Sequence, residues 1–351
     1  MPLRITKFCL PFLIAFALYG CAPAPQMPAQ PAASPTAASL SVTASTPSAQ
    51  PSPERQKKEI LLVYNTDQRR YYLSDFSGAE MTPLELPAEI DSIAMSPDGR
   101  GVAYVPTVYG EDRAAIYLLD INSKKASKLT DTSVTIPGTQ LMAWSPDSQK
   151  ILFSCWVKET TGLSLCSADL TGTIKILIKP EVLNVSGDHD GANAPAWSMD
   201  SSKIVFQSSR SPSVLVEGVK TEAPVDLWVF DVASQQARRI FVDGTAGISM
   251  IMRPVFLPDE NAVLFSGRKD TYNTIFKYNL DTQKVQDITA SGNRYDMTNI
   301  VLSPDGKTFW AYIPLSNDGS QYVPALYSVD GALIKQFDAL KNLQVVSWGE
   351  Q

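Results

Sequence analysis

The densest group of ligand-type side chains in this sequence lies within Gly187-Asp188-His189-Asp190-Gly191-Ala192-Asn193. Asp188, Asp190 and Asn193 supply the carboxylate and amide oxygens that calcium binds, and Gly191 permits a tight bend. The spacing differs from the EF-hand pattern, because the glycine is displaced and no glutamate closes the loop. The alternative is an Asp- and Asn-rich turn that hydrogen-bonds its own backbone. Calcium is the only cofactor that the sequence suggests, and both interpretations stay open.

His189 is the only histidine among the 351 residues. Metal sites built from several imidazoles are therefore excluded. A Ser-His-acid triad would have to use His189, but the sequence contains no Gly-x-Ser-x-Gly elbow. A carboxylate-dependent carbohydrate hydrolase or lyase stays open as an alternative function, because the 36 acidic residues offer too many pairs to choose among.

Cationic and aromatic side chains form a second group of candidate binding residues. They are Arg210, Arg253, Arg268, Arg294 and Tyr295. Arg253 directly precedes a strand predicted to start at Pro254, and Arg294 with Tyr295 falls in the connection that leads to the following repeat. Arginine and tyrosine are frequent anchors of binding interfaces. The alternative is that these arginines pair with neighbouring carboxylates.

Four cysteines occur, and two of them, Cys155 and Cys166, lie beyond the N-terminal region. Both fall in neighbouring predicted strands joined by a hairpin centred on Thr160-Thr161, which would place them directly opposite each other. In an oxidising compartment this arrangement permits a cross-strand disulfide. Two buried free thiols are the alternative.

Residues 1–20 are expected to be an export signal. Arg4 and Lys7 precede the apolar run Phe8 to Leu18, which is shorter than the roughly 20 residues of a spanning helix. Leu18-Tyr19-Gly20-Cys21 resembles the lipobox of bacterial lipoproteins, which implies acylation of Cys21 and a lipid anchor in the cell envelope. Ala22 in place of Asp favours the outer membrane or cell surface, with the folded part in the periplasm or outside the cell. The alternative is an ordinary leader cut within Cys21-Ala22-Pro23-Ala24, which would discard the cysteine.

Residues 21–58 consist almost entirely of Pro, Ala, Ser, Thr and Gln. Such a segment buries too little apolar surface to offset the entropy of ordering it, and its prolines keep it extended. We therefore expect a disordered tether ahead of a folded region at 59–351.

The folded region repeats a turn followed by an apolar run. The copies of the turn are Met95-Ser96-Pro97-Asp98-Gly99, Trp144-Ser145-Pro146-Asp147-Ser148, Trp197-Ser198-Met199-Asp200-Ser201, Phe256-Leu257-Pro258-Asp259-Glu260 and Leu302-Ser303-Pro304-Asp305-Gly306. Ser-Pro-Asp-Gly suits a type I turn, and each copy precedes a β-rich apolar run such as Ile151-Leu152-Phe153. A later anchor, such as Leu227-Trp228-Val229-Phe230-Asp231, then leads to a polar fourth strand. Four strands per repeat indicate a propeller blade.

The length of the region predicts six blades. Glu59 to Asn65 reads as a second strand that lacks a first, and Leu343 to Trp348 reads as a first strand with nothing after it. Pairing of the two would complete one blade and close an all-β, six-bladed propeller with four antiparallel strands per blade.

These turn and strand motifs resemble those of the TolB-like, WD-repeat-like (PD40-type) propellers over residues 59–351. The resemblance implies a binding platform, a part of an exported complex, or a propeller attached to a hydrolase, although no second domain is evident for the last. The formal net charge of −6 argues against nucleic acid.

The connections that we expect on one face of the disc are long, and the turns on the other face are tight. The long ones are Ser209 to Asp226, Pro180 to Ala194, Asp243 to Ile251, Ser291 to Asn299 and Pro314 to Pro324. Function concentrates on loops held by a rigid scaffold, so we expect the site there. The predicted function is a monomeric, membrane-anchored propeller that binds or scaffolds an envelope protein, peptide or glycan.

Overall fold

The structure is a computed structural model that describes residues 58–107, 115–131, 134, 136, 141–158, 160–185, 190–209, 215–216, 219–220, 224–258, 261–270, 272–289, 300–314 and 322–351. All of them belong to one compact unit, Arg55–Gln351. The predicted signal, Cys21 and all but the last residue of the predicted tether lie outside the described residues. Within the described part of the chain, no helix has the length and apolar character needed to cross a membrane.

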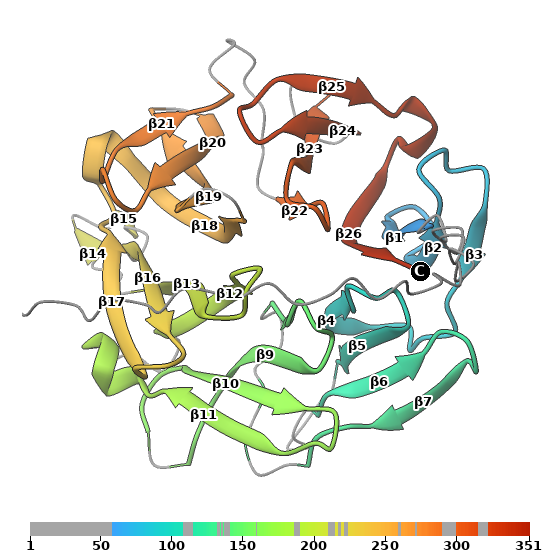
Figure 1. The fold of residues 1–351 in the computed structure, drawn as a ribbon, viewed down its shortest axis with the longest axis horizontal. Helices are drawn as coiled ribbons and strands as arrows, with labels where there is room; N and C mark the ends of the chain where they lie inside the picture. Colours follow the sequence, from blue (N-terminus) through green and yellow to red (C-terminus); the bar gives the residue numbers. More distant parts are fainter. Residues whose placement is uncertain are drawn as a thin grey trace, which may run out of the picture. The chain divides into compact units, whose positions relative to one another are not determined.

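Six four-stranded antiparallel sheets are arranged as the blades of a propeller (Figure 1), which confirms the predicted fold. From the axis outward, blade 1 contains β26 (Leu343–Glu350), β1 (Glu59–Asn65), β2 (Arg70–Ser74) and β3 (Met81–Pro83). Blade 2 contains β4 (Ile90–Met95), β5 (Gly101–Pro106), β6 (Tyr117–Asp120) and β7 (Lys125–Lys128). Blade 3 contains β8 (Ala143–Trp144), β9 (Lys150–Cys155), β10 (Ser164–Asp169) and β11 (Ile174–Ile178).

The remaining blades follow the same order. Blade 4 contains β12 (Gly191–Trp197), β13 (Lys203–Ser209), β16 (Val225–Asp231) and β17 (Gln236–Phe241). Blade 5 contains β18 (Ile248–Leu257), β19 (Ala262–Lys269), β20 (Tyr272–Asn279) and β21 (Val285–Asp287). Blade 6 contains β22 (Val301–Leu302), β23 (Thr308–Pro314), β24 (Tyr322–Ser328) and β25 (Leu333–Gln336). A small hairpin, β14 (Leu215–Val216) with β15 (Val219–Lys220), lies in the connection between β13 and β16, and η1 (Pro180–Leu183), η2 (Thr245–Gly247) and η3 (Asp338–Leu340) are short 3-10 turns.

The Ser-Pro-Asp turns form as the sequence predicts. In the first, the Gly99 N–H donates to the Ser96 carbonyl at 2.9 Å, and the Ser96 hydroxyl donates to Asp98 Oδ1 at 2.6 Å. The same hydroxyl oxygen accepts the N–H of Gly101 at 2.9 Å, where the next strand begins. The turns at Ser145, Ser198 and Ser303 repeat this pattern. The serine carbonyl thus accepts the N–H that closes the turn, and the serine hydroxyl accepts the N–H at the start of the next strand. These two bonds explain why the motif recurs in several blades.

Apolar side chains hold the blades together pairwise. The described residues form six hydrophobic clusters, one at each junction between neighbouring blades. Phe153, Phe206, Phe265 and Trp310 are essentially inaccessible to solvent within them. Because each blade buries both faces of its sheet against its neighbours, a single blade would not be stable alone.

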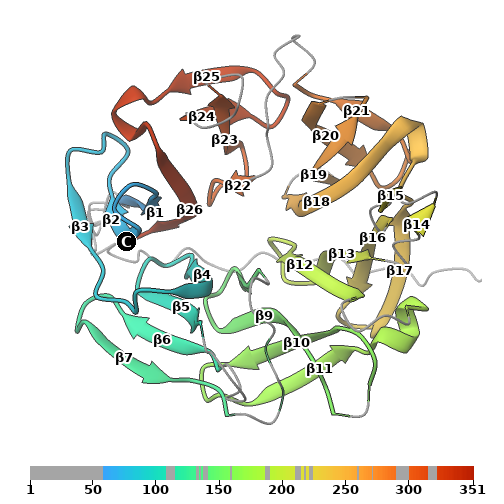
Figure 2. The same cartoon turned by 180° about the vertical axis from the view of Figure 1, so that it is seen from behind.

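The last strand of the chain closes the ring. β26 pairs antiparallel with β1 from Glu59 opposite Glu350 to Asn65 opposite Leu343, with a bulge at Leu62 and Val63. Figures 1 and 2 show β26 as the innermost strand of the blade that β1, β2 and β3 complete. The C-terminal strand therefore supplies what the N-terminal blade lacks, as predicted.

Two of the predicted boundaries in blade 5 are wrong. Arg253 does not precede its strand, because β18 starts at Ile248 and includes it. The connection predicted to run from Asp243 to Ile251 is correspondingly short and contains η2. The full length of β18 was not predictable from the sequence pattern, because two register shifts interrupt its pairing with β19. They lie between Ser249 and Met252 and between Met252 and Val255.

Candidate functional site

The innermost strands of all six blades line a cavity on the propeller axis, which we call the axial cavity. Its volume is about 500 Å³. The lining comes from Ile90–Ala94 of β4, from Ala194–Ala196 in the second half of β12, from Ile300 and Val301 at β22, from Leu141–Ala143, from Arg253–Val255 and from Gln344, Val346 and Ser347 of β26, with Tyr64 and Tyr71 beside them. At the end away from the Ser-Pro-Asp turns, the lining includes Ile90 at the start of β4, and Tyr64 and Tyr71 beside the β1–β2 turn. The cavity therefore reaches the face of the longer connections, where the sequence predicted a site.

Arg253 is the one cationic residue among the described residues that line the axial cavity. Its φ of 50° is unusual for a side-chain-bearing residue, and its backbone N–H donates to Gln207 Oε1 of the neighbouring blade at 3.1 Å. Burial lowers the pKa of the guanidinium, and Tyr312 partly opposes this shift. A guanidinium nevertheless stays charged at physiological pH. The bulged strand thus holds a partly buried cation at the axial cavity.

Two tyrosines stand on the blade 1 side of the same cavity. The Tyr64 and Tyr71 rings are 4.8 Å apart between centroids, in a tilted arrangement. Burial, with a smaller effect of Tyr64, raises the pKa of the Tyr71 hydroxyl to about 12, so this group remains protonated at physiological pH. The carboxylate Oδ1 of Asp91 accepts a hydrogen bond from the Thr107 hydroxyl at 2.6 Å. The cavity therefore combines aromatic surface, hydroxyl groups and a partly buried positive charge.

The remaining candidates from the sequence are dispersed. Asp188, His189, Arg210, Arg294 and Tyr295 lie outside the described residues. Arg268 projects from β19, is exposed, and is not among the residues lining the axial cavity. Asn193 lies in β12, where its Oδ1 accepts the N–H of Ala194 at 2.6 Å.

Asp190 and Gly191 lie where the backbone of blade 4 meets Leu163, the residue that precedes β10 of blade 3. The Asp190 carbonyl accepts the N–H of Leu163 at 2.6 Å, and the Leu163 carbonyl accepts the N–H of Ala192 at 3.1 Å. A Cβ on Gly191, whose φ is 125°, would lie 2.2 Å from the Leu163 carbonyl oxygen. The glycine therefore permits the close approach of two blades. No group of three or more His, Cys, Asp or Glu side chains is arranged for a metal in the part of the chain that the structure describes.

Cys155 and Cys166 form a disulfide across the β9–β10 hairpin, with their Cα atoms 6.1 Å apart. The predicted pairing was wrong in register, because Cys155 lies opposite Ser164 and Cys166 lies opposite Phe153. The bond is thus diagonal. The hairpin is not centred on Thr160-Thr161, because opposed residues such as Cys155 and Ser164 place its centre one residue earlier in the chain.

A second opening, which the sequence did not suggest, lies on the face of the Ser-Pro-Asp turns. It has a volume of about 530 Å³, and its lining includes Trp144, Trp197, Phe256 and Trp348 near the ends of the inner strands. It shares Ala143, Ala196 and Val255 with the axial cavity, so the two meet along the axis. In the sequence, the aromatic residue that precedes several of the Ser-Pro-Asp turns is the feature from which this opening could have been predicted.

No family model matches the chain, and no curated protein matches it. Among solved structures, TolB from Acinetobacter baumannii superimposes with a TM-score of 0.57 at 18% identity, over 84% of this chain and 66% of that one. The chain therefore spans slightly less than two thirds of that TolB. A putative TolB from Agrobacterium tumefaciens gives a TM-score of 0.55 at 18% identity, over 81% and 89% of the two chains. A chain of a nidogen/laminin complex gives 0.55 at 10% identity, over 83% and 98%. At these identities the likeness shows the fold: the chain is a six-bladed β-propeller similar to that of TolB.

Proposed function

We propose that this propeller is a non-enzymatic binding or scaffold module of the cell envelope, anchored by a lipid on Cys21, and that it binds a protein, peptide or glycan partner at the axial cavity. The observation that carries the proposal is the convergence of all six inner strands on one cavity that contains Arg253. Similarity to TolB propellers supports a binding role.

The chemistry of the cavity favours a partner group that accepts hydrogen bonds. A partly desolvated guanidinium such as that of Arg253 binds a carboxylate or a carbonyl cluster more strongly than a fully exposed one does. The Tyr64–Tyr71 pair offers ring faces for an apolar or sugar surface beside it. A partner that inserts an acidic or carbonyl-rich loop into the opening fits these features.

The competing function, a carboxylate-dependent hydrolase or lyase, requires two carboxylates facing a common space. Among the described lining residues of the axial cavity, Asp91 is the one carboxylate, and it already accepts the Thr107 hydroxyl. No feature of the cavity therefore favours this second candidate.

The test is affinity capture from a solubilised envelope fraction with the immobilised full chain. Arg253→Ala should lose most of the recovered partner, because truncation of an arginine that anchors an interface commonly weakens binding about 30-fold or more. Arg268→Ala, at an exposed position of β19 in the same blade, is the matched control and should recover as much as the parent. Equal recovery by Arg253→Ala and parent, with both variants melting normally, would refute the site.

Calcium at Asp188, Asp190 and Asn193 is a separate proposal. A ligand that binds only the folded state raises its melting temperature. Adding a chelator to the full chain should then lower the melting temperature, and adding calcium back should restore it. An unchanged melting curve would refute calcium binding at these residues.

A further inference from the structure

A third pocket lies between blades 1 and 2, on the face of the Ser-Pro-Asp turns, and we call it the seam pocket. Its volume is about 290 Å³. Its walls are the start of β1 with Gln351, the β2–β3 and β6–β7 turns, and the segment after β3. It shares no lining residue with the axial cavity, so it is independent of the function proposed above.

The floor of the seam pocket is apolar. It consists of Ile60, Leu73, Leu84, Leu119 and Ile121. Leu73 and Leu119 are buried in the cluster between blades 1 and 2, whereas the other three are only partly buried against it. β3 has just three residues, so the outer edge of blade 1 leaves part of this cluster uncovered. Such a surface favours an aliphatic group.

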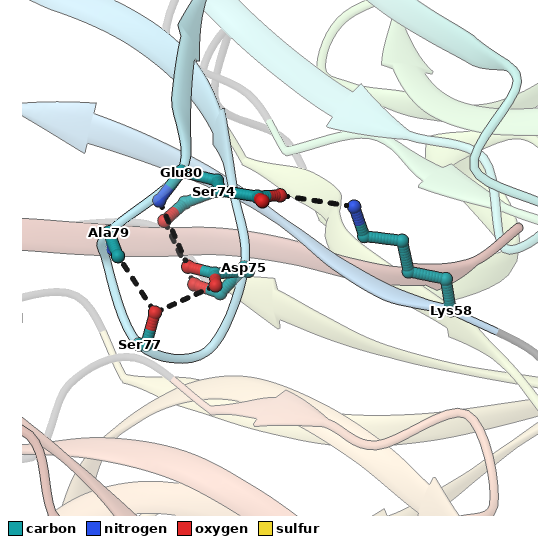
Figure 3. Close-up of polar contacts among 6 residues, drawn as sticks. All are labelled: Lys58, Ser74, Asp75, Ser77, Ala79 and Glu80. Atoms are coloured by element: carbon teal, nitrogen blue, oxygen red, sulfur yellow. Dashed lines mark hydrogen bonds and ion pairs between the residues drawn. The ribbon is translucent and has the colours of Figure 1, made fainter.

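The rim of the seam pocket carries an excess of negative charge. Its carboxylates are Glu59, Asp75, Glu80, Glu85 and Asp120, and its cations are Lys58 and Lys124. Lys58 Nζ lies 3.2 Å from Glu80 Oε2 (Figure 3), so one of the two cations already has a partner. A cation from outside would therefore meet more carboxylates than ammonium groups.

Two of the carboxylates are fixed in place by the turns that carry them. Asp75 accepts the Ser77 hydroxyl at 2.7 Å and the backbone N–H of Glu80 at 3.4 Å (Figure 3). Asp120 Oδ1 accepts the backbone N–H of Ser123 at 2.6 Å. These hydrogen bonds lower the pKa of both carboxyl groups, so both stay ionised well below neutral pH. The rim is thus negatively charged without needing to rearrange.

We propose that the seam pocket receives the side chain of a lysine or arginine from a partner protein. The methylene stem would lie on the apolar floor while the charged end reaches the rim carboxylates, which is how long cationic side chains cover apolar surfaces. A neutral apolar side chain would meet the floor but desolvate the carboxylates without compensation. A small inorganic cation would gain nothing from the floor.

The test compares two fluorescein-labelled peptides for binding to the full chain by anisotropy. The first has three lysines separated by serines, and the second carries 2,3-diaminopropionate in place of each lysine. The second keeps an amine at every position and removes three methylenes from each stem. The lysine peptide should bind about tenfold more tightly, since each buried methylene contributes several-fold.

Paired variants locate the binding. Glu85→Gln with Asp120→Asn keeps the hydrogen-bond acceptor at the β6–β7 turn and removes two charges from the rim. Glu181→Gln with Asp67→Asn removes the same charge at exposed positions outside the pocket. The first pair should weaken the lysine peptide about fivefold, and the second should leave its affinity unchanged. Absence of binding, equal affinity for the two peptides, or equal loss in both variant pairs would overturn the proposal.

Discussion

Lys58 and Gln351 are joined by two reciprocal backbone hydrogen bonds. The Lys58 N–H donates to the Gln351 carbonyl at 2.9 Å, and the Gln351 N–H donates to the Lys58 carbonyl at 2.8 Å. They extend the β1–β26 ladder to the last residue of the chain. We call this pairing of β1 with β26, together with the Lys58–Gln351 bonds, the clasp. It gives blade 1 its inner strand.

Weakening the clasp should therefore weaken the whole ring. Val345 is fully buried at the junction of blades 6 and 1, and Val345→Ala should lower the free energy of unfolding by about 2 kcal/mol, because it removes buried methyl groups and leaves a cavity. Urea unfolding followed by circular dichroism measures this. Gln344→Ala, at the exposed neighbouring position, is the control and should change stability by less than about 0.5 kcal/mol. Equal effects of the two substitutions would contradict the closure.

The Cys155–Cys166 bond should stabilise blade 3. It closes a short loop, with a sequence separation of 11, for which constraint of the unfolded chain contributes about 2 to 3 kcal/mol. Adding a reductant should lower the free energy of unfolding by that amount, and peptide mass spectrometry should identify the linked pair. The double variant Cys155→Ala with Cys166→Ala serves as control, since its stability should not respond to reductant. An unbonded pair in the oxidised protein would show the prediction to be wrong.

Asp200 should make stability depend on pH in the acidic range. The Ser198 hydroxyl, then the Ser202 N–H and hydroxyl, lower the pKa of this carboxyl from 3.8 to about 2. Because its pKa is lower in the folded state than in the unfolded chain, the carboxylate stabilises the fold above about pH 4, and this contribution is lost as the pH falls toward 2. Asp200 is exposed, so solvent screening keeps the effect small. The difference in stability between the parent and Asp200→Asn should shrink over that window, and a constant difference would argue against it.

Asp226 should be among the most sensitive polar positions. Its side chain is fully buried, its Oδ2 lies 3.2 Å from Arg239 Nη1, and its Oδ1 accepts the Asp243 N–H at 2.9 Å. Asp226→Ala should lower the free energy of unfolding by about 2 to 3 kcal/mol, because the partly buried Asp243 N–H and the Arg239 guanidinium both lose their acceptor. Arg238→Ala, one residue from Arg239 and exposed, should cost less than about 0.5 kcal/mol. Thermal or urea unfolding of both variants distinguishes a specific network from a general effect of charge.

The repeated local motifs were predictable because each acts within a few residues. Ser96 bonds Asp98 and Gly101, and Asp231 caps its own turn through the Ser234 N–H at 2.8 Å, so the sequence spacing alone specifies these reversals. The pairing of the two end strands was predictable as well. Glu59–Asn65 has no first strand before it and Leu343–Glu350 has no second strand after it, so each could complete the blade of the other.

What the sequence could not decide depends on register and on neighbours distant in the chain. Arg253 enters the axial cavity because two bulges in β18 redirect the strand, and bulges leave little trace in an apolar pattern. The diagonal position of Cys155 and Cys166 follows from a strand register centred one residue earlier than the spacing of the two cysteines predicts. The seam pocket exists because Leu84 and Leu119, from different blades, meet beside the short β3. Local hydrogen bonding and periodicity therefore determined the blades and their number, whereas the cavities arise from packing between blades, which only the closed ring establishes.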